Sequence, residues 1–125
     1  MNQGEKITSF TDLITWQKGH ALVIEVYRIT NTFPNKEKFS LSDQLQRAAV
    51  SITSNIAEGF AKWSYKEKTK FYTTSLGSIN EVQNQLLIAR DVGYLSKKEF
   101  DSVINQSKDT KSLINGLISS TRKKI

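Results

Sequence analysis

The sequence predicts an all-α protein, an antiparallel up-down-up-down four-helix bundle, from three observations. Apolar residues recur at three- and four-residue spacing in four long stretches, and no stretch of useful length alternates as a strand does. One proline and six glycines in 125 residues leave room for long helices. Serines followed three residues later by an acid mark helix starts. The expected helices are about 10–31, 41–61, 64–92 and 96–124, in one domain of residues 1–125.

The first two expected helices are separated by a break around Pro34. Ser9 with Asp12 at the third helical position predicts the first helix start, and Ser40 predicts the second. The first helix is expected to carry an inward stripe of Leu13, Trp16, His20, Val23, Ile24 and Tyr27. This position makes His20, the one histidine, a core residue rather than a metal ligand.

The second helix centres on residues 47–59, RAAVSITSNIAEG, which are rich in small side chains. One stripe allows close approach of another helix and consists of Ala48, Ile52, Asn55, Ile56 and Gly59. A neighbouring stripe carries hydrogen-bonding groups and consists of Arg47, Ser51, Ser54 and Glu58. We expect a polar network around Asn55 and Glu58, with Arg47 or Ser78, that fixes helix register or a subunit contact. A catalytic acid is the alternative interpretation, for which no partner residue is found.

The third and fourth expected helices begin at capping boxes, Ser64 with Glu67 and Ser96 with Glu99. Gly93 is placed to end the third helix in a left-handed conformation. Small residues at 75–78, together with Trp16 and the small stripe of the second helix, predict a subunit interface. The alternative is that the internal core uses all of them.

The net charge of +6 comes from two short clusters, since basic and acidic residues cancel in 1–61 and 71–121. An up-down-up-down chain direction places both clusters at one end of the bundle. This basic end is expected to bind phosphates through Lys62, Lys66, Lys68, Lys70, Arg122, Lys123 and Lys124. Trp63 and Tyr65 lie among these lysines and are expected to stack on unpaired bases. The alternative is a solvated end in which Trp63 closes the core.

The composition also argues against several classes of protein. There is no cysteine, no apolar run of about 20 residues and no signal-peptide pattern, so we expect a cytoplasmic protein. No metal-ligand cluster, phosphate-binding glycine loop or nucleophile–base pair can be assembled from the sequence. We therefore expect no metal, no cofactor and no enzymatic activity.

Several motifs resemble those of a known family of bacterial proteins. They are Asp12-Leu13, Trp16-Gln17-Lys18, Tyr27, Phe33-Pro34, residues 41–45, residues 47–52, residues 54–60, Phe71, Gly77-Ser78, Glu81 and residues 93–95. The chain resembles, over about residues 10–100, the four-helix-bundle family encoded in intervening sequences of 23S ribosomal RNA genes. The resemblance implies a four-helix bundle, a homopentamer and association with nucleic acid. A related accessory protein of diversity-generating retroelements is a basic, barrel-like pentamer that contacts nucleic acid and a reverse transcriptase. Arg47, Asn55 and Glu58 match motif positions without an assigned role.

The sequence thus predicts a homo-oligomeric binding protein that associates with nucleic acid, RNA rather than DNA, through its basic end. The alternative function is a protein–protein adaptor that docks a partner on the second helix, with its charge serving solubility.

Overall fold

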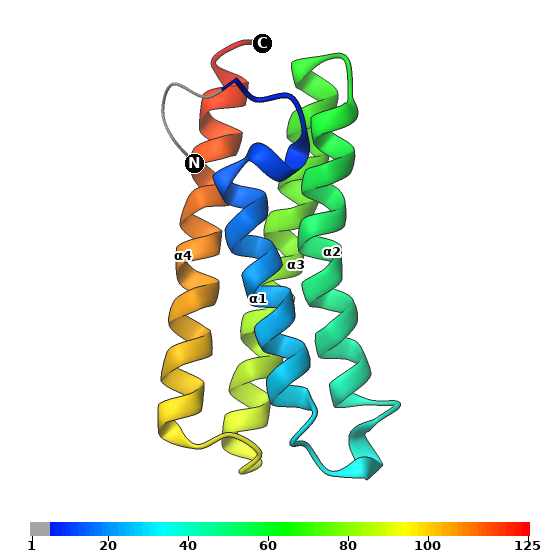
Figure 1. Cartoon of the computed structure of the whole chain (residues 1–125), viewed down its shortest axis with the longest axis vertical. Coiled ribbons are helices and arrows are strands. Elements are labelled where there is room, and N and C mark those ends of the chain that lie inside the picture. Colours follow the sequence, from blue (N-terminus) through cyan, green and yellow to red (C-terminus); the bar gives the residue numbers. More distant parts are fainter. Residues whose placement is uncertain (1–5) are drawn as a thin grey trace.

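The computed structural model describes residues 6–125, which form one bundle of four long helices (Figure 1). The helices are α1 (Ile14–Thr30), α2 (Leu41–Ala61), α3 (Tyr65–Asp91) and α4 (Lys97–Arg122). Successive helices run in opposite directions, and no strand occurs among these residues. The predicted fold class is confirmed. The predicted domain starts at residue 1, and its first five residues lie outside the described range.

The core lies along the bundle axis and is formed by the apolar stripes of all four helices. α2 contributes Leu45, Ala49, Ile52 and Ile56, each fully buried. The other helices contribute buried Leu22, Val26, Ile29, Ile79, Val82, Leu86, Val103, Ile114 and Ile118. Burying a side chain of this size contributes about 1.5–3 kcal/mol, so the packing of these stripes is the main source of stability.

Small residues of α2 allow α3 to approach closely. A Cβ atom added to Gly59 would lie 2.7 Å from Tyr72 Cε1 and 2.9 Å from Phe71 Cβ, so only glycine fits. Ser75 donates its hydroxyl to the carbonyl of Ile52 at 2.8 Å across the same contact. The internal core therefore uses Ala48, Ile52, Ile56 and Gly59 of this stripe together with Ser75 and Ser78, which is the alternative interpretation of these residues. Gly77 is exposed, with no atom within 4 Å of an added Cβ.

The inward face of α1 differs from the prediction. Its buried residues are Thr15, Gly19, Leu22, Val23, Val26, Ile29 and Thr30. Ile24 and Tyr27 are instead 57% and 48% exposed, and His20 is exposed as well. The physical reason lies at Gly19, where an added Cβ would be 3.1 Å from Thr53 Cγ2. Because glycine lets α2 approach closely there, α1 turns its Gly19 side inward.

Helix starts follow the predicted serines with two corrections. Ser9 and Asp12 form the capping box of a 3₁₀ turn, η1 (Phe10–Asp12), and extended Leu13 separates this turn from α1. Ser40 makes no side-chain cap on α2; instead it donates its hydroxyl to Glu37 at 2.6 Å, and Glu37 also accepts from the backbone N–H of Leu41.

The ends of α3 and the start of α4 are close to the prediction. Ser64 and Ser96 each accept a backbone N–H three residues later, at 3.1 Å, and the return half of each expected box is not formed. Gly93 has φ 87° and ends α3 as predicted. Its N–H and that of Tyr94 donate to Arg90 and Ala89 carbonyls, the pattern of a Schellman motif.

Candidate nucleic-acid interface

The antiparallel topology brings the two basic clusters together. α2 ends, α3 begins and α4 ends at the upper end of the molecule in Figure 1. Lys124 Nζ lies 5.5 Å from the ring centroid of Tyr65, which joins the last residues of α4 to the first turn of α3. Residues almost 60 positions apart in the chain therefore belong to one surface. We call the seven cations Lys62, Lys66, Lys68, Lys70, Arg122, Lys123 and Lys124 the basic end.

The seven cations of the basic end differ in their exposure and in their contacts. Lys66, Lys70, Arg122, Lys123 and Lys124 are exposed. Lys68 is partly buried and donates to the carbonyl of Phe60 at 2.6 Å, with a longer contact of 3.4 Å to that of Gly59. It thus caps the C-terminus of α2, and burial lowers its pKa. Lys62 is also partly buried and lies 4.9 Å from the Phe71 ring centroid. The five exposed cations are therefore the best placed for phosphate.

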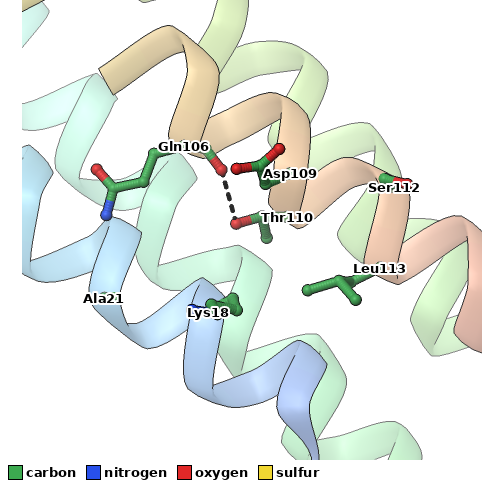
Figure 2. A pocket seen from close by; sticks show the side chains of 7 residues that line it. All are labelled: Lys18, Ala21, Gln106, Asp109, Thr110, Ser112 and Leu113. Carbon is green, nitrogen blue, oxygen red and sulfur yellow. Dashed lines mark hydrogen bonds between the residues drawn. The ribbon is translucent and has the colours of Figure 1, made fainter. Parts of the chain in front are cut away.

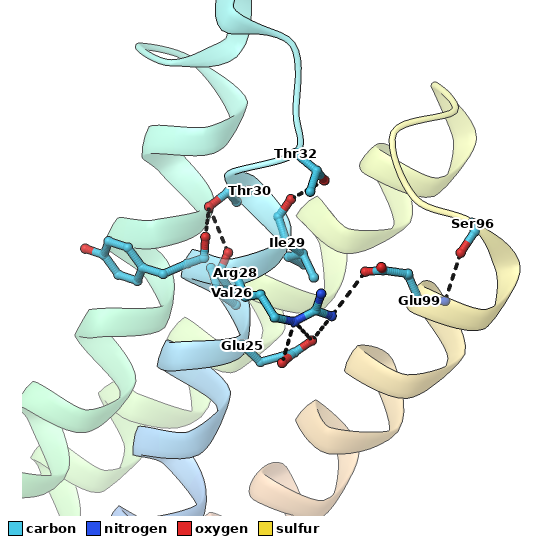
Figure 3. A network of polar contacts seen from close by, with 9 residues as sticks. Glu25, Val26, Arg28, Ile29, Thr30, Thr32, Ser96 and Glu99 are labelled. Atoms are coloured by element: carbon cyan, nitrogen blue, oxygen red, sulfur yellow. Dashed lines mark hydrogen bonds and ion pairs between the residues drawn. The ribbon is translucent and has the colours of Figure 1, made fainter.

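Ion pairing distinguishes the basic end from the rest of the bundle. Within residues 6–125, every side-chain ion pair lies elsewhere: Arg28–Glu25, Arg28–Glu99, Arg47–Asp43, Arg90–Asp91 and Lys97–Asp101. Figure 3 shows one of these sites, where Arg28 lies between Glu25 of α1 and Glu99 of α4. The hydrogen bonds and charges of these two carboxylates raise the pKa of Arg28. None of the seven cations of the basic end is ion-paired with a carboxylate of residues 6–125, so no such pair cancels their positive potential.

Helix direction adds to this potential. The basic end includes the N-terminus of α3, where backbone N–H groups give a positive dipole end. Glu67 in the first turn is the one acid of the 62–70 segment. The dark-blue segment that directly precedes η1 also crosses this end in Figure 1.

Two aromatic side chains lie among these cations with different environments. Trp63, in the short connection between α2 and α3, is 98% exposed. It does not close the core, which was the alternative expectation for this residue. Tyr65 is 41% exposed and has Lys124 over its ring. Trp63 thus offers a free aromatic face beside cations, the combination on which unpaired bases stack.

The motif residues of α2 divide into a connected group and a separate pair. Asn55 donates to the carbonyl and hydroxyl oxygens of Ser51, at 2.8 and 3.1 Å, and Ser51 contacts the Ser78 hydroxyl at 2.8 Å. Arg47 instead pairs with Asp43 on its own helix at 2.9 Å. Glu58 is exposed. The expected network therefore forms with Ser51 at its centre, without Arg47 or Glu58.

His20 lies on the outer side of α1, and the prediction that it is a core residue is wrong. Its ring stacks on Trp16 with centroids 4.7 Å apart, and Trp16 packs edge-on against Phe10 at 5.4 Å. Trp16 is partly buried and packs against the core, as the predicted stripe has it. His20 was assigned to the same stripe because spacing alone does not say where the buried side of a helix ends. Among residues 6–125, no group of three potential metal-ligating side chains occurs.

A hollow of about 430 Å³ lies between α1 and α4 (Figure 2). It is lined by Lys18, Ala21, Gln106, Asp109, Thr110, Ser112 and Leu113. Thr110 donates its hydroxyl to the carbonyl of Gln106 at 3.0 Å, so that group is satisfied within α4. Lys18 and Asp109 bring opposite charges to this lining, in contrast to the uniform charge of the basic end.

The fold and surface define an antiparallel four-helix bundle with seven cations collected at one end, none of them ion-paired among the described residues. The model of the 23S rRNA-intervening sequence protein family matches residues 11–116, and the chain belongs to this family. A search of curated proteins found no match. A solved structure from Bacteroides thetaiotaomicron, a protein of unknown function from the S23 ribosomal protein family, has a similar fold with a TM-score of 0.79. The two chains are 21% identical, and the match covers 85% of this chain and 96% of that one.

No helix among residues 6–125 has the length and hydropathy needed to cross a membrane.

Proposed function

We propose that this chain is a non-enzymatic, homo-oligomeric protein of the bacterial cytoplasm that associates with nucleic acid, RNA rather than DNA. Nucleic acid is bound by the basic end, where exposed Lys66, Lys70, Arg122, Lys123 and Lys124 meet phosphates. Lys62 and Lys68 support the same surface, and Trp63, with Tyr65 beside it, stacks on bases. The observation that carries the proposal is that both basic clusters meet at one end, where no cation is ion-paired with a carboxylate of the part of the chain that the structure describes.

Membership of the 23S rRNA-intervening sequence protein family supports this proposal. The preference for RNA is supported by exposed Trp63, since unstacked bases are more common in folded RNA than in duplex DNA. No cofactor or metal is required for such binding. The role is that of a binding protein rather than a catalyst.

The test is a salt titration with a fluorescently labelled, structured RNA. Charge reversal of Lys66 and Lys70 to glutamate should lower the affinity and flatten the plot of log affinity against log salt by about 1.5–2 units, because each lost phosphate contact removes close to one unit. Lys36→Glu with Lys98→Glu, two exposed cations far from the basic end, is the matched control. An unchanged slope in the Lys66/Lys70 variant would contradict the proposal.

Lys68→Met gives a second comparison within the basic end. Because Lys68 caps α2, this change should lower the free energy of unfolding by about 0.5–1.5 kcal/mol and leave the salt slope nearly unchanged. A DNA of the same sequence, titrated in parallel, measures the preference for RNA.

The proposed homo-oligomer has independent support on the surface. Exposed apolar side chains include Ile24 of α1 at 57%, Leu87 and Ile88 of α3 at 39% and 42%, and Val92, which follows α3, at 55%. Ile88 and Val92 are four residues apart, the spacing of neighbours on a helix surface, and clustered apolar side chains of this kind mark subunit contacts. Light scattering should give a mass about five times the 14.2 kDa of one chain if the assembly is the pentamer implied by the family resemblance. A monomer at micromolar concentration would contradict the homo-oligomer.

The adaptor function, in which a face of α2 docks a partner, has less support. Ala48, Ala49 and Gly59 of α2 are buried within the bundle.

A further inference from the structure

A polar hollow of about 290 Å³ lies on the outer side of the contact between α2 and α3, along the first half of α2. It is lined by Gln44, Arg47, Ala48, Ser51, Ser78, Glu81 and Gln85. All of these side chains except that of Ala48 are polar, and none belongs to the basic end. The hollow contains two motif residues, Arg47 and Ser51, that the proposed function does not use.

The hydroxyl groups of the hollow are hydrogen-bonded to each other and to neighbouring groups. The Ser51 and Ser78 hydroxyls are 2.8 Å apart, and either can be the donor. Ser78 can instead donate to the carbonyl of Thr74 at 3.3 Å, and Asn55 donates to the Ser51 oxygen at 3.1 Å. Whichever serine donates to the other, the two hydroxyl oxygens together keep free lone pairs that can accept a further hydrogen bond.

Gln85 provides a further acceptor at the same place. The residue is 9% exposed, and its Oε1 is buried and receives no hydrogen bond from residues 6–125. A buried amide oxygen without a donor costs about 1–3 kcal/mol. It is therefore an acceptor that favours a donor group entering the hollow.

The charges around the hollow favour a cation. Glu81 is exposed and has no ion pair among the described residues. Arg47 directs its Nε to Asp43 at 2.9 Å, so one carboxylate offsets its charge. The lining and this neighbour together carry a net charge of about −1, in a protein whose overall charge is +6.

We propose that the α2–α3 hollow binds a guanidinium or primary ammonium group. Gln85 Oε1 and the Glu81 carboxylate accept its N–H groups, and the serine oxygens complete the set of acceptors. The volume corresponds to about ten waters at ~30 Å³ each, which suits the head of a cationic chain and is more than one bridging water needs.

The experiment is an NMR titration of the ¹⁵N-labelled full chain with agmatine, which has both a guanidinium and an ammonium group. Saturable shifts should appear at Ser51, Ser78, Glu81 and Gln85, including the Gln85 side-chain amide. Urea, which resembles guanidinium without its charge, and sodium chloride at matched ionic strength are the ligand controls. Glu81→Gln should weaken agmatine binding about tenfold, since it removes a charged acceptor.

Glu58→Gln is the matched control variant, because it makes the same change on an exposed carboxylate outside the hollow. Gln85→Leu should abolish the saturable shifts and raise the stability of the ligand-free protein, because it removes the buried acceptor. Higher stability with unchanged binding would overturn the role given to Gln85.

Light scattering distinguishes two sources of the bound cation, a second copy of this chain and a free amine. A lower assembly mass for Glu81→Gln, but not for Glu58→Gln, identifies a lysine or arginine of a second copy. Saturable agmatine binding at unchanged mass identifies a free amine. If agmatine gives no saturable shifts, or only those seen with urea, and neither variant alters the mass, the hollow is filled by solvent alone and the proposal is overturned. RNA binding by the basic end is unaffected by any of these outcomes.

Discussion

Gly59 shows how one residue determines the distance between two helices. Its hydrogen atom faces the Tyr72 ring and the Phe71 Cβ, where a methyl group would lie inside van der Waals contact. In contrast, Gly116 lies in α4 with no atom near the position a Cβ would take. The two glycines are equal in helix propensity and differ only in tertiary surroundings.

Gly59→Ala is therefore expected to destabilise the protein by about 1–3 kcal/mol, because the overpacking exceeds the gain of up to ~1 kcal/mol in helix propensity. Gly116→Ala should stabilise it by about 0.4–1 kcal/mol, since only the propensity term applies. Urea unfolding of both variants measures the difference. Equal effects of the two substitutions would mean that α2 and α3 do not approach closely at Gly59.

Glu37 connects two loops at the end of the bundle opposite to the basic end. It follows α1 in the short turn η2 (Asn35–Glu37), and it accepts the Tyr94 hydroxyl at 2.6 Å from the loop between α3 and α4. Phe33 packs on the Tyr94 ring with centroids 5.3 Å apart. Hydrogen bonds from Ser40 and Tyr94 lower the pKa of Glu37 below its ordinary value of 4.5. The same contact raises the pKa of Tyr94.

This pair predicts an acid-dependent component of stability. Because the pKa of Glu37 is lower in the folded than in the unfolded chain, the unfolded chain binds the proton first as the pH falls. The contribution is present in full above about pH 5 and is lost as the pH falls through the folded pKa. Urea unfolding between about pH 3 and 7 should show a smaller acid loss in Glu37→Gln than in the native chain. Tyr94→Phe retains the ring and should give an intermediate loss of stability in acid. The assignment would be contradicted if Glu37→Gln lost as much stability over this pH range as the native chain does.

At the scale of the whole molecule, the two ends of the bundle differ in charge organisation. The end that contains the connections 31–40 and 92–96 has ion pairs at Arg28, Arg90 and Lys97 beside the exposed cations Lys36, Lys38 and Lys98. The basic end collects seven cations, none of which forms an ion pair with a side chain of residues 6–125. This polarity depends on chain direction, because each cluster alone contributes only half of the net charge.

The two clusters should therefore act as one binding surface. Reversal of Arg122 and Lys123 to glutamate is expected to flatten the salt dependence of RNA binding by about 1.5–2 units, as much as reversal of Lys66 and Lys70. Anisotropy titrations at several salt concentrations measure both slopes. If only the variant at Lys66 and Lys70 responds, α4 does not contribute to the interface.

Sequence patterns were sufficient for most helix limits and for the place of the basic clusters, because both depend on local spacing. The serine caps, Gly93 and Pro34 identify helix ends by short-range chemistry. The outward position of His20 and Ile24 was not predictable in the same way, since α1 has apolar residues on two sides. Gly19 determines which side of α1 is buried, and its small size matters only because Thr53 of α2 lies against it.

In the candidate sites, too, residues that look alike in the sequence differ in their tertiary surroundings. Lys66 and Lys68 have the same side chain two residues apart, yet one is free for phosphate and the other caps α2. Likewise, Gln85 lies in a sequence that contains several amides, and only packing leaves its oxygen buried without a donor.

The amino-acid order by itself determined four helices, their alternating direction and the two runs of positive charge, because periodicity, caps and short connections are local properties. The tertiary structure decided which face of α1 is buried, which lysines are free and where an acceptor-lined hollow forms. The physical reason is that burial and hydrogen-bond satisfaction depend on neighbours from other helices, which spacing along one helix does not specify.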